Sequence, residues 1–200
     1  MIQNEEDILQ HIASRNPDRF RLIFRTFERR IKNYVCRVIS TREDAEEVVQ
    51  NTFMNAFRHL DDYKPERASL LTWLMRIATN EIRMYLRKKQ PSLVSLDEDE
   101  EHMHLVSDDE ADQILMETTE NRITHLQQAI KLLSADEQLL LQLYYTEQRS
   151  LRDISFIIDS EKPMVETDTR RMENQLAQRL HRIRKKLSMN IKKMEKDEKQ

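Results

Sequence analysis

Glycine does not occur among the 200 residues of this chain, and its absence restricts the possible folds more than any other feature. Primed hairpin turns, β-bulges and left-handed helix caps rely heavily on glycine, because other residues are strained at positive φ. A chain without glycine is therefore poorly suited to building sheets. We predict an all-α protein.

Charge divides the chain into segments. The net charge is −3, but residues 91–120 contain eleven Asp or Glu and no Lys or Arg, whereas residues 1–90 and 121–200 each carry a net charge of +4. An acidic run without helical apolar periodicity repels itself, so we expect an extended acidic linker. It would join a small helical domain at 1–90 to a second at 121–188, followed by a charged tail at 189–200.

Several classes of protein do not fit the sequence. Cys36 is the only cysteine, which rules out an intramolecular disulfide and suits a reducing compartment. No apolar run approaches the roughly 18 residues of a membrane span, and the N-terminus lacks the pattern of a signal peptide. His102 and His104 are more simply explained as two solvated histidines than as a metal site. We expect a cytoplasmic protein that is not inserted in a membrane, is not an enzyme and needs no metal or cofactor.

Apolar residues at helical spacing predict three long helices in the first domain, at Phe20–Ile39, Ser40–Leu60 and Leu70 to about Lys89. The first two should form an antiparallel hairpin. Ser40 and Glu43 predict a capping box at the start of the second helix.

The second and third helices each carry a polar stripe opposite their apolar wall. On the second helix the stripe consists of acids ending in amides, which a solvated face would also explain. On the third helix Arg76, Asn80, Arg83 and Arg87 recur at i, i+4, i+7 and i+11, and either a solvated face or phosphate binding accounts for them. Trp73 lies at the margin of this stripe, where its ring could belong to the core or stack on a base.

The second domain has the pattern of a helix-turn-helix module. A helix at Ile123–Leu133 should be followed by two short helices, which begin at the capping pairs Ser134–Glu137 and Ser150–Asp153. A last helix is expected from near Thr167 to Leu187. Its apolar spacing is also typical of a coiled-coil-like protein contact.

Two runs of the first domain, DAEEVVQNTFMNAFRHL and SLLTWLMRIATNEIRMYLRKK, closely resemble region 2 of bacterial RNA polymerase sigma factors of the extracytoplasmic-function (ECF) subgroup. This resemblance covers roughly Phe20 to Lys89. A weaker resemblance to sigma region 4 covers Ile123 to Leu187, through LLSADEQLLLQLYYTEQRSLRDIS and RLHRIRKKL. Together, the two resemblances imply a subunit that directs core RNA polymerase to promoters and helps to melt the minus-ten element.

The resemblance also implies roles for particular residues. The acidic stripe would bind the clamp helices of the polymerase β′ subunit, and its residues are Asp44, Glu46, Glu47, Gln50 and Asn51. Contacts with minus-ten promoter DNA would come from the loop at 61–69 and the helix after it, through Lys64, Arg67, Trp73, Arg76, Asn80, Arg83 and Arg87. The β flap of the polymerase and an anti-sigma factor are further candidate partners.

The second domain departs from the family pattern. The run FIIDSEKPMVETDTRRMENQLAQRLHR lacks the Gly-Thr-Val with which the recognition helix normally starts. A helix in the major groove usually reads bases with its N-terminal turn. Candidate minus-thirty-five contacts are therefore Thr169, Arg170, Arg171, Glu173 and Asn174, with Arg179 and Arg182 further along. The alternative function is a helical regulatory protein with sigma-like architecture that binds a protein partner and does not itself initiate transcription.

The linker at 91–120 yields a testable prediction. Its acids should be repelled by DNA and attracted to basic surfaces, so we expect it to thread the RNA-exit path of the polymerase or to contact the basic blocks of its own chain. In the second case it would screen nonspecific DNA binding. Replacing its acids with Ser and Asn should then strengthen the binding of free protein to nonspecific DNA over a salt titration. An unchanged affinity would favour an inert spacer.

Overall fold

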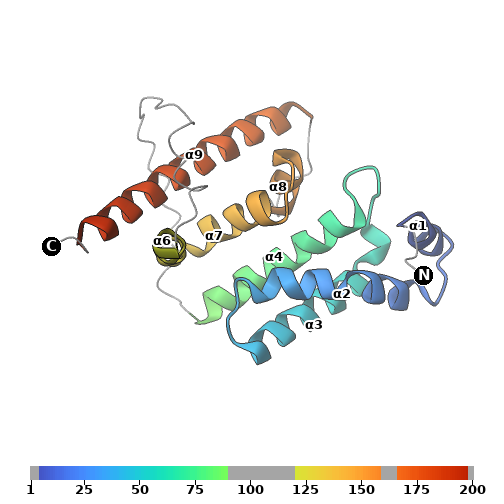
Figure 1. Ribbon diagram of the computed structural model, residues 1–200. Helices are drawn as coiled ribbons and strands as arrows, with labels where there is room; N and C mark the ends of the chain where they lie inside the picture. Colours follow the sequence, from blue (N-terminus) through green and yellow to red (C-terminus); the bar gives the residue numbers. More distant parts are fainter. Residues whose placement is uncertain (1–4, 90–119, 159–165, 198–200) are drawn as a thin grey trace. The chain divides into compact units, whose positions relative to one another are not determined.

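A computed structural model describes residues 5–89, 120–158 and 166–197, and the elements within these ranges are helices (Figure 1). No strand occurs in the described ranges, so the all-α prediction is confirmed. The linker predicted at 91–120 lies outside the described residues except for Glu120, and so do His102 and His104.

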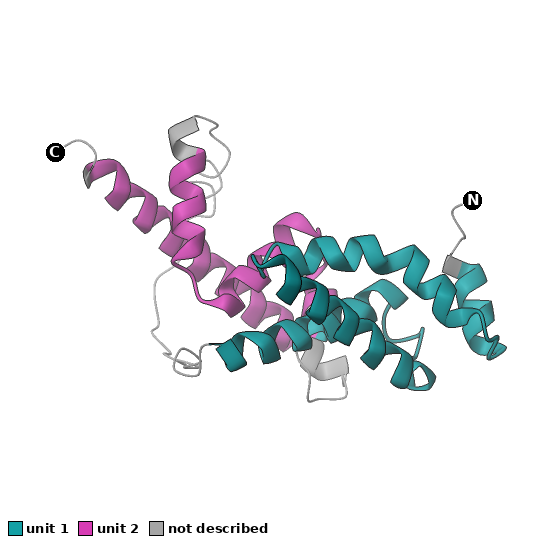
Figure 2. Cartoon of the chain, turned by 90° about the horizontal axis from the view of Figure 1, so that it is seen from below, with its two compact units in different colours: residues 1–94, 156–162 teal, residues 95–155, 163–200 magenta. Residues whose placement is uncertain are grey.

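The chain divides into two compact units, which are coloured separately in Figure 2. Unit 1 comprises residues 1–94 and 156–162, and unit 2 comprises residues 95–155 and 163–200.

Unit 1 is built around three long helices. Its elements up to residue 89 are α1 (Glu5–Ala13), α2 (Arg19–Cys36), α3 (Arg42–Arg58), the 3-10 turn η1 (Leu60–Asp62) and α4 (Leu70–Lys89). Helices α2, α3 and α4 each contact the other two, and α1 contacts α2. All three helices predicted from apolar spacing are confirmed, and α4 has the predicted bounds.

The core of unit 1 lies where α2, α3 and α4 meet. Ile31 of α2 and Leu74 of α4 are fully buried, and Phe53 of α3 is 2% exposed. The Tyr34 hydroxyl lies 2.9 Å from the Thr79 hydroxyl oxygen. Because Thr79 donates its own proton to a backbone carbonyl of α4, Tyr34 is the donor in this bond between α2 and α4.

The predicted capping box at Ser40 and Glu43 is wrong. Helix α3 begins at Arg42, so its N-cap is Thr41, whose side chain makes no capping hydrogen bond. Ser40 therefore lies one residue too early to reach the free amides of the first turn. Asp44, not Glu43, occupies the third helical position, and its carboxylate contacts α4 instead of the N-cap backbone.

Unit 2 contains the predicted succession of short helices followed by one long helix. Its elements are α6 (Glu120–Lys131), α7 (Ala135–Leu141), the π-helical turn η2 (Gln142–Thr146), α8 (Leu151–Ile158) and α9 (Glu166–Asp197), the last residues of α8 belonging to unit 1. Helix α9 contacts α6 and α7.

Both predicted caps of unit 2 are confirmed. The Ser134 hydroxyl accepts from the Glu137 amide at 3.3 Å, and the Glu137 carboxylate accepts from the Ser134 amide at 2.7 Å, which completes a capping box. At the start of α8 the Ser150 hydroxyl accepts from the Asp153 amide at 3.1 Å.

The expected end of the last helix at Leu187 is wrong. Helix α9 continues to Asp197, through most of the segment that the sequence analysis placed in a charged tail. Ile191 is only 4% exposed and lies one turn beyond the buried Leu187, so the apolar face continues. Leu187, Ile191 and Met194 continue the helical spacing at i, i+4 and i+7, a signal that the predicted end at Leu187 overlooked among the surrounding lysines.

Without glycine in the chain, two described residues, Arg15 and Gln148, adopt the left-handed conformation that glycine would favour. Arg15 has a φ of 52°, in the left-handed region, and lies two residues after Ala13, the last residue of α1. Its amide bonds to the Ile12 carbonyl at 3.0 Å, and the Asn16 amide bonds to the His11 carbonyl at 2.9 Å. These are the two bonds of a Schellman motif, in which glycine usually occupies the position that Arg15 holds here.

We predict that Arg15→Gly stabilises unit 1, although glycine normally destabilises helical proteins. The left-handed conformation costs a residue with a Cβ about 1–2 kcal/mol, whereas the added chain entropy of glycine offsets only part of that gain. The free energy of unfolding, measured in urea, should therefore rise by about 0.5–1 kcal/mol.

Arg15→Ala is the matched control, because it removes the same exposed side chain and keeps the strain. Equal effects of the two substitutions would show that the side chain, and not the backbone conformation, determines the change in stability.

Candidate functional site

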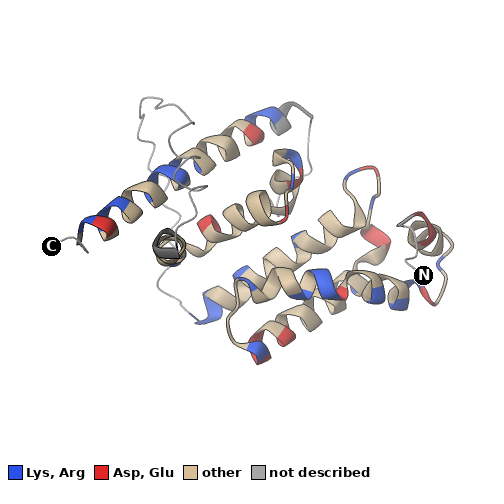
Figure 3. Ribbon diagram, viewed as in Figure 1, with Lys and Arg blue, Asp and Glu red and all other residues tan. Residues whose placement is uncertain are grey.

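The predicted acidic stripe lies on α3, where acidic residues are visible near its N-terminal end in Figure 3. Its members differ in exposure: Glu46, Glu47 and Gln50 are exposed, and Asp44 and Asn51 are half-buried. Asp44, Glu47 and Asn51 also line a groove between α3 and α4. The stripe therefore combines a surface part with a part that faces the neighbouring helix.

Asp44 is bound within the fold. One carboxylate oxygen accepts hydrogen bonds from the Lys89 ammonium at 2.7 Å and from the Tyr85 hydroxyl at 2.6 Å. The bond from Lys89, followed by the bond from Tyr85, lowers the pKa of Asp44 below its usual value, and the same carboxylate raises the pKa of Lys89. Asp44 thus joins the start of α3 to the end of α4.

Glu46 also has partners within the chain. Its carboxylate accepts from the Lys32 ammonium of α2 and from the Arg42 guanidinium one turn earlier in α3, both at 3.1 Å. The bond from Lys32, and then that from Arg42, lowers the pKa of Glu46. The exposed Glu47 and Gln50 are therefore the members of the stripe best placed to meet another molecule.

Most of the residues predicted to contact minus-ten DNA gather around a single hollow. The loop after η1 and the first turns of α4 both contribute to its wall, and five of the seven predicted residues line it: Lys64, Arg67, Trp73, Arg76 and Asn80. Arg83 and Arg87 do not line the hollow and lie further along α4. Cationic side chains from two different segments thus face one concave surface.

A short network of contacts holds this loop in shape. The Tyr63 hydroxyl donates to the Ala68 carbonyl at 3.1 Å, which links the two ends of the loop. The Ser69 hydroxyl accepts from the Thr72 amide at 3.2 Å and caps the start of α4. Trp73 packs on Tyr63 with 5.3 Å between ring centroids and also lines the hollow, so it has both a packing contact and an accessible side.

Asn55 and Glu81 are among the residues in the wall of the hollow that the sequence did not indicate. Asn55 of α3 donates from its amide to the Glu81 carboxylate of α4 at 2.7 Å, and its own oxygen accepts from Arg58 at 3.1 Å. Glu81 is 9% exposed. Its position between the buried Ala78 and Ile82 was the available signal, because an acid on the apolar side of a helix normally needs a partner.

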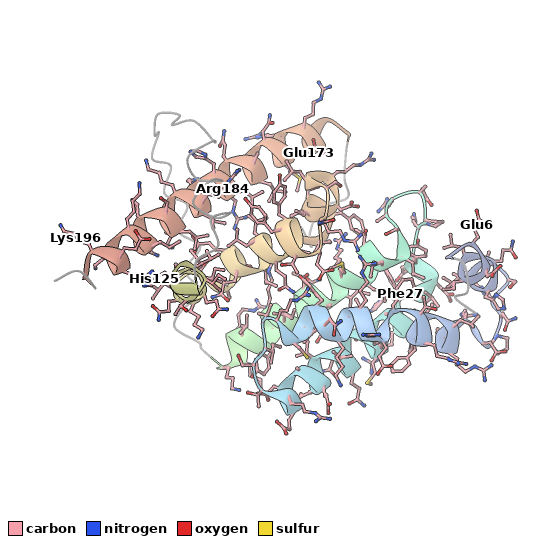
Figure 4. The ribbon with its side chains drawn as sticks, in the orientation of Figure 1. Glu6, Phe27, His125, Glu173, Arg184 and Lys196 are labelled. Carbon is pink, nitrogen blue, oxygen red and sulfur yellow. The ribbon has the colours of Figure 1, made fainter. Side chains whose placement is uncertain are left out.

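The candidates for minus-thirty-five contacts are spread along α9. Glu173, labelled in Figure 4 near the start of this helix, and Arg179 are half-buried. The other four candidates with described side chains are exposed: Arg170, Arg171, Asn174 and Arg182. The side chain of Thr169 lies outside the described part of the structure.

The described ranges contain neither a cluster of metal-ligating side chains nor a membrane-spanning helix. No group of three or more His, Cys, Asp or Glu side chains is arranged to hold a metal ion there. In the same ranges, no helix combines the length and the apolar character needed to cross a membrane.

Comparison with known proteins relates the chain to a family of transcription proteins. Residues 23–91 match the family described as Sigma-70 region 2. The ECF RNA polymerase sigma-E factor of Haemophilus influenzae is 26% identical over 162 residues, which is 78% of this chain and 84% of that protein. The RNA polymerase sigma-H factor of Pseudomonas aeruginosa is 26% identical over 166 residues, 79% and 85% of the two chains.

A third relative comes from another bacterium, Bacillus subtilis. Its ECF RNA polymerase sigma factor SigW is 26% identical over 178 residues, 86% of this chain and 94% of that protein. The resemblance to ECF sigma factors that the sequence motifs indicated is thus confirmed over most of the chain.

The bonds of Asp44 predict a pH-dependent stability. A carboxyl group whose pKa is lowered by folding stabilises the fold above its unfolded-state pKa of about 4, and this contribution disappears as the pH falls through the folded-state value. Asp44→Asn should therefore lower the urea midpoint of unfolding at pH 7. The difference from the parent should shrink as the pH falls from about 5 to about 3.

Glu43→Gln is the matched control, because Glu43 is an exposed acid in the same turn of α3. It should change the midpoint much less at every pH. A deficit of Asp44→Asn that stayed constant with pH would show that the carboxylate does not stabilise the fold through its charge.

Proposed function

We propose that this chain, whose residues 23–91 match the Sigma-70 region 2 family, is an ECF-type sigma factor that directs core RNA polymerase to promoters. The observation that carries the proposal is the gathering of Lys64, Arg67, Trp73, Arg76 and Asn80 around one hollow of a unit that also has an acidic face on α3. The relatives that cover most of the chain support the same function.

The acidic face would bind the β′ clamp helices of the polymerase. Opposite charges across an interface speed the encounter and set its register more than they add affinity. Glu47 and Gln50 are exposed and available for such contacts, whereas Asp44 is held by α4. We therefore assign the first contacts to Glu47 and Gln50, and to Asp44 the task of fixing α3 on α4.

The hollow would hold a base of the minus-ten element after it leaves the stack. Lys64 and Arg67 lie exposed on the loop, where they can bind phosphates on either side of the base. The amide of Asn80 can bond to a base edge, and the accessible side of Trp73 offers an aromatic surface for stacking. Binding an unpaired base in this way favours the melted promoter.

The remaining assignments follow from the same role. Polymerisation chemistry would belong to the core enzyme, so the chain itself needs no catalytic residue and acts in the cytoplasm with its polymerase. Helix α9 would contact the minus-thirty-five element through its exposed Arg170, Arg171 and Asn174, and unit 2 would bind the β flap. An anti-sigma factor is the natural candidate for a regulatory partner.

Two variants test the proposal, because one should impair open-complex formation and the other should impair association with core polymerase. Lys64→Ala/Arg67→Ala removes two exposed cations from the loop, and it should reduce open-complex formation while leaving core binding nearly intact. Glu47→Lys reverses one exposed charge of α3, and it should slow association with core polymerase at low salt while leaving the lifetime of the complex less changed. Association kinetics and promoter-dependent run-off transcription measure the two effects.

Asp7→Lys is the charge-matched control for Glu47→Lys, because Asp7 is exposed on α1. If both test variants impaired core binding equally, the division into a polymerase-facing helix and a DNA-facing hollow would be wrong. Failure of the parent chain to support transcription from any genomic fragment, with core binding intact, would favour a regulatory interaction protein.

A further inference from the structure

Helix α2 carries a row of arginines to which the proposed function gives no role. Arg21, Arg25 and Arg29 follow one another at four-residue intervals and are all exposed. Figure 3 shows basic residues recurring along α2. We call these three residues the α2 arginine row.

The row lies on the side of α2 that faces away from the other long helices. The buried residues Ile23, Phe27, Ile31 and Tyr34 form the opposite wall of the helix, and Tyr34 bonds to α4. None of the three arginines lines the hollow or the groove between α3 and α4. The row is therefore separate from the hollow and from the acidic face of α3.

The row does not stabilise its own helix. Arginines four residues apart repel each other on a helix surface, and α2 has only one acid, Glu28, to offset them. The first turn of α2 contains no acid, although the helix dipole favours negative charge there. Arg21 does pair with Asp18 at 3.2 Å, but Arg25 and Arg29 form no ion pair with another described residue.

Lys32 of the same helix, by contrast, is a cation that stabilises the packing of two helices. Its ammonium lies 3.1 Å from the Glu46 carboxylate and joins α2 to α3. The α2 arginine row has no comparable bond to α3 or α4 in the described residues. The arginines repel one another and form no bond that joins α2 to α3 or α4 in the part of the chain that the structure describes. This arrangement points to a partner outside the fold.

We infer that the α2 arginine row is a second phosphate-binding surface, which holds promoter DNA next to the segment in the hollow. This inference rests on the proposed function, because the same DNA must reach both surfaces. Arg21 and Arg29 are eight residues apart, about 12 Å along the helix axis, which is long enough to meet two or three phosphates of a duplex. Arginine also suits this task because its planar guanidinium can bind a phosphate through two parallel hydrogen bonds.

The test uses the full chain assembled with core polymerase. Arg25→Gln/Arg29→Gln should weaken binding to promoter DNA and to a scrambled duplex by the same factor, because phosphate contacts carry no sequence information. The slope of log affinity against log salt should fall by up to about two units, since each lost phosphate contact removes roughly 0.9. Arg25→Lys/Arg29→Lys keeps the charge and should retain most of the parent slope.

Two controls separate this effect from other causes. Lys192→Gln/Lys193→Gln removes the same charge from exposed positions of α9, and it should not reproduce the loss of slope. The thermal midpoint of Arg25→Gln/Arg29→Gln should equal or exceed that of the parent, because only repulsion between the arginines is removed. A lower midpoint would make the row structural and overturn the inference.

Other outcomes also overturn it. An unchanged salt slope would exclude phosphate contacts, and slower core association with normal DNA binding would assign the row to a protein partner. If Lys64→Ala/Arg67→Ala blocked open-complex formation while the α2 variant behaved as the parent, the proposed function would stand and only this inference would fail. If neither variant affected DNA binding, the proposed function would fail with it.

Discussion

The burial of one apolar wall on each of α2, α3 and α4 is the constraint on which unit 1 depends. Buried hydroxyls in this core are bonded: those of Thr52 and Thr79 donate to carbonyls of their own helices at 2.7 and 2.8 Å, and Tyr34 donates to Thr79. A buried hydroxyl without a partner would cost about 1–3 kcal/mol. Because the walls take up the apolar residues, the charged ones remain on the outer faces, where contacts with other molecules are made.

The outer charges fall into two groups that differ in their partners. Asp44 and Lys89 bond to each other and fix the start of α3 against the end of α4. Glu47, Arg25 and Arg29 are exposed, with no such bond to another described helix. A charge in the first group adds to the stability of the fold, whereas a charge in the second adds little and can act on a partner. The distinction rests on geometry, because both groups occupy similar positions in the helical periodicity.

The sequence predicted the helices of unit 1 well, because apolar residues at helical spacing lie on one face of each helix and that face is the one buried in the core. The sequence was less informative about side-chain partners that lie far apart in the chain. The bond from Lys89 to Asp44 spans 45 positions, and no local pattern indicates it. The gathering of Lys64 and Arg67 with Asn80 likewise depends on how the Tyr63 hydroxyl shapes the loop. The capping error at Ser40 had a local cause, since a shift of the helix start by a single residue changes which acid can reach the N-cap.

The ion pairs of Glu46 need not prevent the acidic face from binding a partner. Arg42 is 81% exposed and Lys32 is 41% exposed, and such surface pairs contribute little to stability because water and salt screen them. A cationic partner could therefore replace them at small cost. Asp44 differs, with a side chain 27% exposed and two bonds to α4, so breaking its contacts would also loosen the packing of α3. A partner of the acidic face would thus make its first and main contacts with Glu47 and Gln50. It could then bind Glu46 in place of Lys32 and Arg42, and it would leave the bonds of Asp44 intact.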